Sequence, residues 1–394
     1  MKQAKRDTML LETPFHSRVA ELCEINDWGN WMGYTTPNAF FDVELEYFAI
    51  RSTTGVFDLS PMNKYRIQGP DAEAYLNRLA TRDVSKIGVN RVGYTVWCND
   101  AGKVMDDGTI FRLGASDFRL CSYQRAIDWL LWCALGFDVS ITDETDTIAA
   151  LAVQGPTSCT CLTGIGLTDL NTLKPFGMRN YEFDGAPLMI SRTGFTGDLG
   201  YEVWVPPEKA ELLWDRLFEA GKDYLIKPFG SYALDIARIE TGFIQAGVDF
   251  VPAEEMVRPG RSRSPFELGL SWLVDLKKPL FNGRTALLKE HQEGSKFRFV
   301  MLNVDGNKPA EHSFILKGEQ QIGTVTSAAW CPTAKSNIAF AQLEMPEGNV
   351  GQEYVAEIYY QRELHWTRVL APCTVMDGPI FNPKRRRQTP AIPH

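Results

Sequence analysis

Apolar residues recur at two different periods along the chain, which separates expected helices from expected strands. In residues 38–52, Phe41, Leu45 and Phe48 are spaced as on one face of a helix, and the pattern ends near Gly55. Further helices are expected after Gly69-Pro70-Asp71 and at 207–220 and 231–241. Short apolar or alternating runs predict strands at 64–67, 94–98, 103–113, 148–153 and 188–192.

The order of these elements predicts two mixed units followed by an all-β unit. Helices and strands alternate in residues 1–145 and again in 146–250. Residues 251–295 begin with a stretch rich in Pro, Gly, Arg and Glu, which indicates a connecting segment. Residues 296–394 are β-rich with Gly-containing turns, as in a small barrel or sandwich.

Two adjacent carboxylates lie in the clearest predicted hairpin, whose turn is Asn99-Asp100-Ala101-Gly102. Asp106 and Asp107 occupy the return strand among apolar neighbours. Side chains alternate between the faces of a strand, so only one of the two can face a given pocket. A buried ionised carboxylate needs a partner, so either aspartate is a site candidate or a structural group that caps the hairpin or pairs with an arginine.

A glycine-rich loop, residues 192–202, connects two predicted strands and leads into Glu202. Gly194, Gly197 and Gly200 would let the backbone approach a flat ligand closely. The loop matches neither dinucleotide nor P-loop motifs, because it lacks GK[ST] and a strand follows it. Glu202 could accept hydrogen bonds from adjacent N–H donors of a planar heterocycle, or it could be an ordinary edge-strand glutamate.

Composition and charge exclude several classes of protein. The chain has 41 Lys and Arg against 49 Asp and Glu, a formal charge of -8, which argues against a nucleic-acid partner. We interpret the basic run 384–387 as a solvated tail. Residues 1–13 contain no signal-peptide core, and no later apolar run could span a membrane, so we expect a cytoplasmic protein without a membrane partner.

Cysteine and histidine spacing predicts neither disulfides nor a metal site. The 8 cysteines form no CxxC pair, and the 5 histidines show no HExxH or similar ligand spacing. Aromatic residues make up 11% of the chain, and most are expected in the core, although some could form a stacking wall or a cage around a cationic methylated group.

Several short strings together resemble the glycine-cleavage aminomethyltransferase family, the folate-dependent superfamily that includes dimethylglycine and sarcosine dehydrogenase folate domains and folate-dependent demethylases. The strings occur in the family's order over nearly the whole chain, at residues 55–60, 98–107, 154–156, 192–202, 265–270 and 322–327. The resemblance implies an α+β, three-domain fold around a central folate channel, with a C-terminal β-barrel. Fold alone does not fix the reaction.

The resemblance also implies roles for individual residues. Asp107 matches the family's essential aspartate near the reactive nitrogens of tetrahydrofolate, and Glu202 matches the glutamate that binds the pterin ring. The other cofactor-binding positions expected are Tyr94, Phe195, Phe243 and Met62. The expected substrate-pocket residues are Trp31, Trp97 and Tyr123.

Departures from the family pattern predict a changed one-carbon donor. Ser60-Pro61-Met62-Asn63 replaces the aminomethyltransferase string Ser-His-Met-Gly, and Leu234 stands where the family has an arginine. Asparagines of a further family string are missing around 121–124. The pterin-facing residues persist while the side that receives the aminomethyl-lipoyl group differs.

The leading hypothesis is therefore a tetrahydrofolate-dependent methyltransferase, in effect a demethylase, that acts on a small methylated substrate: a sulfonium, a methylated amine or an aryl methyl ether. An alternative is the glycine-cleavage aminomethyltransferase, which requires a lipoyl carrier protein. Another is a non-enzymatic folate-binding iron–sulfur assembly factor, although residues 279–284 lack that branch's cysteine. No GxGxxG motif is present, so we expect no flavin of its own.

Overall fold

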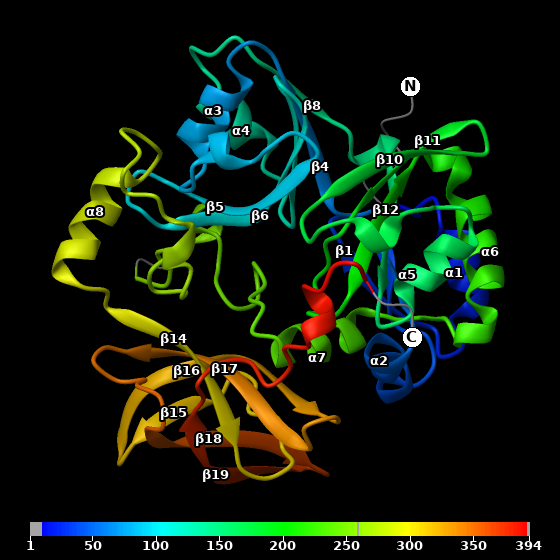
Figure 1. The fold of residues 1–394 in the computed structure, drawn as a ribbon. Helices are drawn as coiled ribbons and strands as arrows, with labels where there is room; N and C mark the ends of the chain where they lie inside the picture. Colours follow the sequence, from blue (N-terminus) through cyan, green and yellow to red (C-terminus); the bar gives the residue numbers. More distant parts are fainter. Residues whose placement is uncertain (1–9, 258–259, 392–394) are drawn as a thin grey trace.

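The computed structural model describes residues 10–257 and 260–391, so most of the stretch 1–13 examined above lies outside the described residues. An antiparallel five-stranded sheet, a mixed six-stranded sheet and a β-barrel surround the centre of the molecule (Figure 1). The mixed α/β units and the closed C-terminal barrel confirm the predicted fold class.

The first sheet has five strands in the order β5-β6-β7-β4-β8. Its helices cover one face and bury a core that includes Trp97, Tyr75 and Leu76. The elements of this unit are β4 Asn63–Gln68, α3 Ala72–Leu79, β5 Arg91–Cys98, β6 Val104–Gly114, β7 Asp117–Ser122, α4 Ile127–Cys133 and β8 Ser140–Asp143. The predicted hairpin is confirmed as β5 and β6.

The second sheet has six strands in the order β10-β11-β12-β9-β3-β13. Its elements are α1 His16–Leu22, α2 Val43–Ser52, β3 Gly55–Asp58, β9 Ala149–Gln154, α5 Ser158–Gly164, β10 Met178–Phe183, β11 Ala186–Ser191, β12 Gly200–Val205, α6 Ala210–Ala220, β13 Lys227–Pro228 and α7 Ser231–Glu240. β3 pairs with β9 and β13, so the strand pairing crosses the domain boundary expected at residue 145. The expected boundaries at 250 and 295 remain predictions.

The barrel closes in the order β14-β17-β16-β15-β18-β19, and β14 pairs with β19. Its elements are β14 Phe297–Val304, β15 Phe314–Lys317, β16 Gln320–Cys331, β17 Ser336–Glu344, β18 Glu353–Arg362 and β19 His365–Val375, preceded by α8 Arg284–Glu293. Short 3-10 helices are Val84–Lys86, Thr145–Thr147, Leu170–Thr172, Pro207–Lys209, Lys222–Tyr224, Ala253–Glu255, Ser271–Leu273 and Lys384–Arg386.

The helix expected at 38–52 begins later, at Val43, because an unpredicted hairpin precedes it. β1 (Asp27–Trp31) and β2 (Tyr34–Ala39) pair through a turn at Met32 and Gly33, both at positive φ. The Asp42 side chain accepts a hydrogen bond from the Leu45 N–H and caps the helix. This hairpin carries Trp31, whose ring lies 6.1 Å from that of Phe57 on β3.

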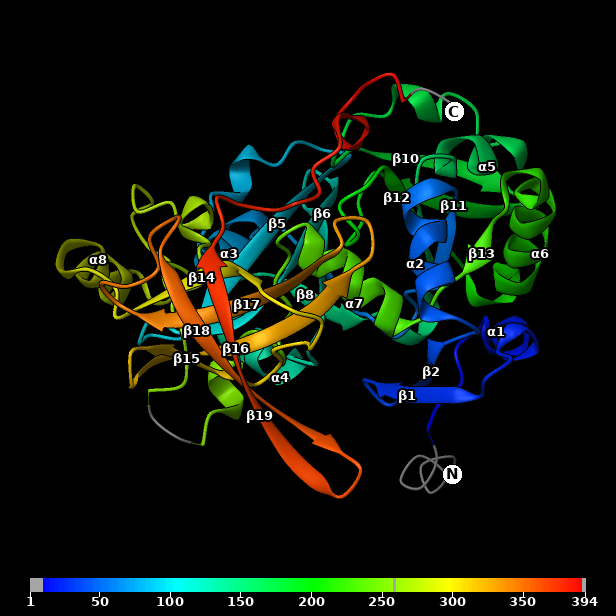
Figure 2. The same cartoon turned by 90° about the horizontal axis from the view of Figure 1, so that it is seen from below.

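The interpretation of 384–387 as a solvated tail is wrong. The C-terminal segment runs from the barrel back to the second sheet (Figure 2). There Arg385 donates two hydrogen bonds to the fully buried Asp198 carboxylate, at 2.6 and 2.7 Å. Arg192 donates to the carbonyl oxygens of Arg385 and Gln388. The basic run is anchored because it neutralises a buried carboxylate.

Replacing Arg385 with Gln is expected to lower the free energy of unfolding by roughly 2–3 kcal/mol, because Asp198 would stay buried without its cation. Urea unfolding of the full chain measures the change. Arg387→Gln is the matched control, since Arg387 is exposed and donates only to Asn382. Equal, small losses in the two variants would contradict this account of the anchor.

Candidate functional site

Asp106 and Asp107 point to opposite faces of β6, as the alternation predicted. Asp106 is buried and accepts hydrogen bonds from the backbone N–H groups of Asp107 and Gln124, at 2.9 and 3.1 Å. Asp107 is half-buried and accepts a 2.7 Å hydrogen bond from the Tyr94 hydroxyl. No lysine or arginine in the described ranges pairs with either carboxylate. Neither aspartate is therefore the arginine partner that the sequence left open.

The surroundings of Asp107 raise its pKa toward neutrality, although the ionised form still predominates at pH 7. Burial and the charge of Asp249 raise the pKa of Asp107 to about 6, although the hydrogen bond from Tyr94 lowers it. Burial and the neighbouring charge of Asp107 raise the pKa of Asp106 well above its usual value. A carboxyl group with a pKa close to neutral can accept or hold a proton during a reaction.

Glu202 lies on β12 with one carboxylate oxygen held and the other open. Oε2 accepts hydrogen bonds from Thr193 (2.7 Å) and Ser191 (3.4 Å), whereas Oε1 has no donor in the described part of the chain. Burial raises the pKa of Glu202 to about 7 against those two hydrogen bonds. The charge of Glu202 also adds to the burial that raises the pKa of the Cys121 thiol on β7, so Glu202 faces the first sheet.

The glycines of the 192–202 loop make room for protein side chains. A Cβ at Gly194 or Gly200 would lie 2.0 or 2.1 Å from Oε1 of Gln154. Gln154 donates to the Thr193 and Tyr201 carbonyl oxygens and accepts from Thr196. The small size of Gly194 and Gly200 therefore lets the Gln154 side chain pack against the loop, and the expectation that the loop backbone approaches a flat ligand stays a prediction.

Phe195 and Phe243 come together from distant parts of the chain. Their rings stack with centroids 5.6 Å apart and planes inclined by 22°. The Arg386 guanidinium lies 4.8 Å from the centre of the Phe243 ring. The two expected cofactor-binding phenylalanines thus form one aromatic surface, which the C-terminal segment borders.

Trp31 and Tyr123 also meet, whereas Trp97 lies elsewhere. The rings of Trp31 and Tyr123 stack at 5.8 Å, and Phe57 lies 6.1 Å from Trp31. Trp97 has no exposed surface and belongs to the core under α3, on the opposite face of the hairpin from Tyr94. The expectation that Trp97 lines a substrate pocket is corrected, because alternation along β5 turns it inward.

Met62 and Leu234 pack against two different hydrophobic clusters. Met62 packs half-buried against the cluster that contains Trp204 and Cys121. Leu234, on α7, packs against Phe229 and Ala233. The position where the family has an arginine is therefore part of an apolar contact.

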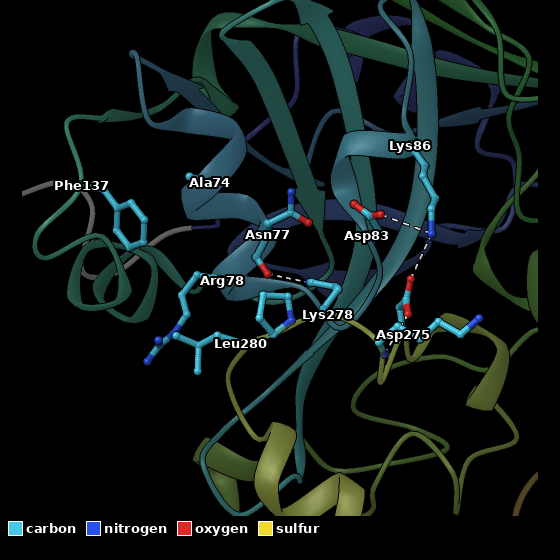
Figure 3. Close-up of a pocket in the computed structure, with 11 residues that line it drawn as sticks. Ala74, Asn77, Arg78, Asp83, Lys86, Phe137, Asp275, Lys278 and Leu280 are labelled. Carbon is cyan, nitrogen blue, oxygen red and sulfur yellow. Dashed lines mark hydrogen bonds and ion pairs between the residues drawn. The ribbon is translucent and has the colours of Figure 1, made fainter.

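One cavity in the described part of the chain lies apart from these residues. It has a volume of about 570 Å³ and lies between α3 and the segment 275–280 (Figure 3). Lys86 bridges Asp83 and Asp275 there, at 3.2 and 3.1 Å, and Lys278 donates to the Asn77 carbonyl oxygen. None of its lining residues is an expected site residue. The candidate site is therefore the region of Asp107, Glu202 and the stacked rings, because the Lys86, Asp83 and Asp275 charges in this cavity are paired with one another.

Residues 10–257 and 260–391 contain neither a metal-binding cluster nor a membrane-spanning helix. No group of three or more His, Cys, Asp or Glu side chains could hold a metal ion. No helix is long and apolar enough to cross a membrane.

Comparisons with known proteins agree with this architecture. The GCVT N-terminal domain matches residues 16–278, and the glycine cleavage T-protein C-terminal barrel domain matches 298–375. The chain belongs to the glycine-cleavage T-protein family. Members of this family are tetrahydrofolate-dependent one-carbon transferases, so the chain is an enzyme of that class and tetrahydrofolate is its cofactor.

Three individual proteins illustrate how similar the chain is to its relatives. The aminomethyltransferase of Caldanaerobacter subterraneus is 33% identical over 82% of this chain and 86% of its own length. The trimethylamine-oxide aldolase of Ruegeria pomeroyi is 34% identical over 96% of this chain, which spans about half (48%) of that relative. The aminomethyltransferase structure from Bartonella henselae superimposes with a TM-score of 0.83 at 23% identity, covering 95% of this chain and 98% of the other.

The residues present fit tetrahydrofolate. Glu202 offers an open carboxylate oxygen to N–H donors of a pterin, and the Phe195–Phe243 pair offers an apolar surface to rings. Asp107 and Tyr94 would lie toward the reacting nitrogens, as the resemblance implies. These assignments of single residues remain predictions.

Sequence reasoning missed Asp249, Gln245 and Arg386. Asp249 and Gln245 follow α7 in a segment without periodicity, and Arg386 belongs to the basic run 384–387, whose composition is typical of a solvated tail. The only sequence signal near them was the 322–327 string, whose hydroxyl side chains contact Asp249.

Tetrahydrofolate affinity is expected to rise with pH around neutrality. Ionised Glu202 is the better acceptor, and its pKa of about 7 means that the ionised fraction grows about tenfold per pH unit below 7 and levels off above it. Calorimetric titrations between pH 5.5 and 8.5, roughly one unit and a half on either side of that pKa, measure the effect. Glu202→Gln should give a flat profile. A flat wild-type profile would contradict the assignment.

Proposed function

We propose that this enzyme transfers a methyl group from a small methylated compound to tetrahydrofolate. The observation that carries the proposal is a pair of adjacent carboxylates without a basic partner in the described residues, the half-buried Asp107 and the buried Asp106. Asp106 binds the backbone next to Tyr123, and the Tyr123 ring stacks on Trp31. Negative charge next to aromatic faces suits a methylated cation, such as a sulfonium or an ammonium group.

The relatives support this choice of donor. The trimethylamine-oxide aldolase, by its name, acts on a methylated amine oxide, and it aligns with nearly all of this chain. Leu234 and the 60–63 string depart from the aminomethyltransferase pattern at the side that would receive the aminomethyl-lipoyl group.

The chain's residues have separate tasks in this reaction. Tetrahydrofolate, when bound, supplies the nucleophilic nitrogen. Glu202 holds the pterin, and the stacked rings orient the donor so that its methyl carbon faces that nitrogen. In this arrangement the methyl group would pass from the sulfur or nitrogen of the donor to the folate nitrogen, and the bonding pair would leave with the neutral sulfide or amine. Asp107 stabilises the positive charge and takes the proton released from the nitrogen.

A second candidate is the aminomethyltransferase activity itself, which the relatives named aminomethyltransferase favour at 30–33% identity. In that case the donor is an aminomethylated lipoyl carrier protein and the product is methylenetetrahydrofolate.

One experiment separates the two. Purified enzyme is incubated anaerobically with tetrahydrofolate and either a panel of sulfonium, ammonium and aryl methyl ether donors or the aminomethylated carrier, and the folates are identified by mass spectrometry. Formation of 5-methyltetrahydrofolate from a small donor supports the proposal. Methylenetetrahydrofolate from the carrier alone replaces it with the second candidate.

A further inference from the structure

A buried ion pair links α7 to the segment that follows it. Arg238 and Asp249 have no exposed side-chain surface, and the Arg238 guanidinium donates to the Asp249 carboxylate. The same guanidinium donates to the Phe243 carbonyl oxygen at 3.2 Å and to Asp235 at 2.7 Å. A charge pair this deeply buried is stable only when its remaining atoms are also satisfied.

The barrel supplies the remaining hydrogen bonds to this ion pair through a β-bulge. The register of β16 against β17 shifts between Val325 and Ser327, with Thr326 as the extra residue. Neighbouring residues of a regular strand face opposite sides, but here both hydroxyls reach the same oxygen: Thr326 and Ser327 donate to Asp249 Oδ1 at 2.7 and 2.6 Å. Arg238 also donates to the Ser327 hydroxyl at 2.7 Å.

The network fixes the segment 242–250, which carries groups of the site. Asp249 Oδ2 accepts from the Gln245 backbone N–H at 2.9 Å, and the Gln245 side chain lies beside Tyr123. Phe243, whose carbonyl Arg238 holds, stacks on Phe195. The segment therefore joins the aromatic surface, Tyr123 and the barrel in one connected unit.

We propose that Arg238, Asp249 and Ser327 are positioning residues for the folate site: the bulged barrel strand holds the ion pair, and the ion pair holds both the 242–250 segment and a compensated negative charge facing Asp107. Arg238 and Asp249 touch neither the pterin-binding Glu202 nor the Tyr94 hydroxyl in the described structure. The proposal rests on the proposed function, because it assigns these residues to that reaction.

The charges around Asp107 make the proposal specific. Tyr94 from β5 and Asp249 from the 242–250 segment act on Asp107 directly, and Asp106, on the opposite face of the same strand, is electrostatically linked to it. Farther out, Glu255 and Tyr123 face Asp106. Asp249 raises the pKa of Asp107, and Arg238 is the basic group that neutralises Asp249. Removing Asp249 should therefore lower the pKa of Asp107, and removing Arg238 should raise it.

The test measures that pKa directly, by carbon NMR of protein labelled at aspartate carboxyls, with Asp107→Asn to assign the resonance. Asp249→Asn is expected to lower the pKa of Asp107, and Arg238→Gln to raise it, each by about one unit. Arg238→Lys should restore it in part. Ser327→Ala, the mildest change, should raise KM for tetrahydrofolate about three- to tenfold with little change in kcat.

Controls separate positioning from stability. Arg119→Gln breaks another largely buried ion pair, with Glu144 at 2.9 Å, and its charge is not among those that shift Asp107. It should lower thermal stability without moving the pKa of Asp107. Shifts of the same sign in Asp249→Asn and Arg238→Gln, or no shift in folded Asp249→Asn protein, would overturn the proposal.

Kinetics and NMR also distinguish this proposal from the proposed function. If wild-type enzyme makes no methylated folate while the opposite pKa shifts occur and Ser327→Ala weakens tetrahydrofolate binding, the methyl-donor assignment fails and the positioning role stands. If wild-type enzyme is active and the pKa shifts are absent, the positioning role alone fails.

Discussion

Replacing Asp107 with Asn is expected to lower the rate of one-carbon transfer by about 10²–10⁴-fold while tetrahydrofolate binds within a fewfold of its wild-type affinity. The amide keeps the hydrogen bond from Tyr94 but can neither carry the negative charge nor take the proton. Single-turnover measurements at saturating tetrahydrofolate isolate the transfer step from binding.

Asp106→Asn is the matched control, because Asp106 is the adjacent carboxylate on the other face of β6 and accepts only backbone N–H groups. Its substitution should affect stability more than rate. A rate for Asp107→Asn within tenfold of wild type would remove Asp107 from the mechanism.

The stability of the Asp107→Asn variant should change in the opposite sense to its activity. The folded-state pKa of about 6 lies above the ordinary 3.8, so the folded protein binds more protons and the free energy of unfolding falls as pH rises between those values. Asn removes that fall. At pH 7, about one unit above the folded-state pKa, the inactive variant should therefore be at least as stable as wild type.

Replacing Glu202 with Gln is expected to weaken tetrahydrofolate binding strongly. In the proposed site the open Oε1 accepts the pterin N–H donors, and hydrogen bonds to a charged group contribute about 1.5–3 kcal/mol each, so the dissociation constant should rise roughly 10–100-fold. Isothermal titration with tetrahydrofolate at pH 8, about one unit above the pKa of Glu202, gives the comparison.

Thr193→Val provides the control for Glu202, since it removes the 2.7 Å hydrogen bond to Oε2, together with the 2.7 Å hydrogen bond between the Thr193 and Ser191 hydroxyls, and leaves the carboxylate. Its loss of affinity should be several-fold smaller. Unchanged binding in Glu202→Gln would move the pterin away from β12.

Local patterns in the sequence predicted the parts of the site that are built locally. The β5–β6 hairpin follows from its turn residues, and the strand period correctly separated Asp106 from Asp107. The same alternation places Trp97 on the face of the hairpin that Asp106 occupies, because the two residues pair across the ladder. Predicting this from the sequence requires the strand register, which the turn residues alone do not specify.

The remaining parts depend on contacts between distant segments. Arg385 is held by Asp198, 187 residues earlier in the chain, and nothing in a run of four basic residues signals such a partner. The glycines of 192–202 accommodate Gln154, which belongs to another strand. Asp249 is fixed by a bulge in the barrel, and a bulge is invisible to hydrophobic periodicity.

The most direct measurement follows deuterium from a trideuteromethyl sulfonium or ammonium donor into the folate pool in a single turnover of wild-type enzyme. The proposed function predicts 5-methyltetrahydrofolate that retains all of the donor's methyl deuterium, and no such product with Asp107→Asn. Folate that stays unlabelled with every methylated donor, while the aminomethylated carrier yields methylenetetrahydrofolate, would contradict it.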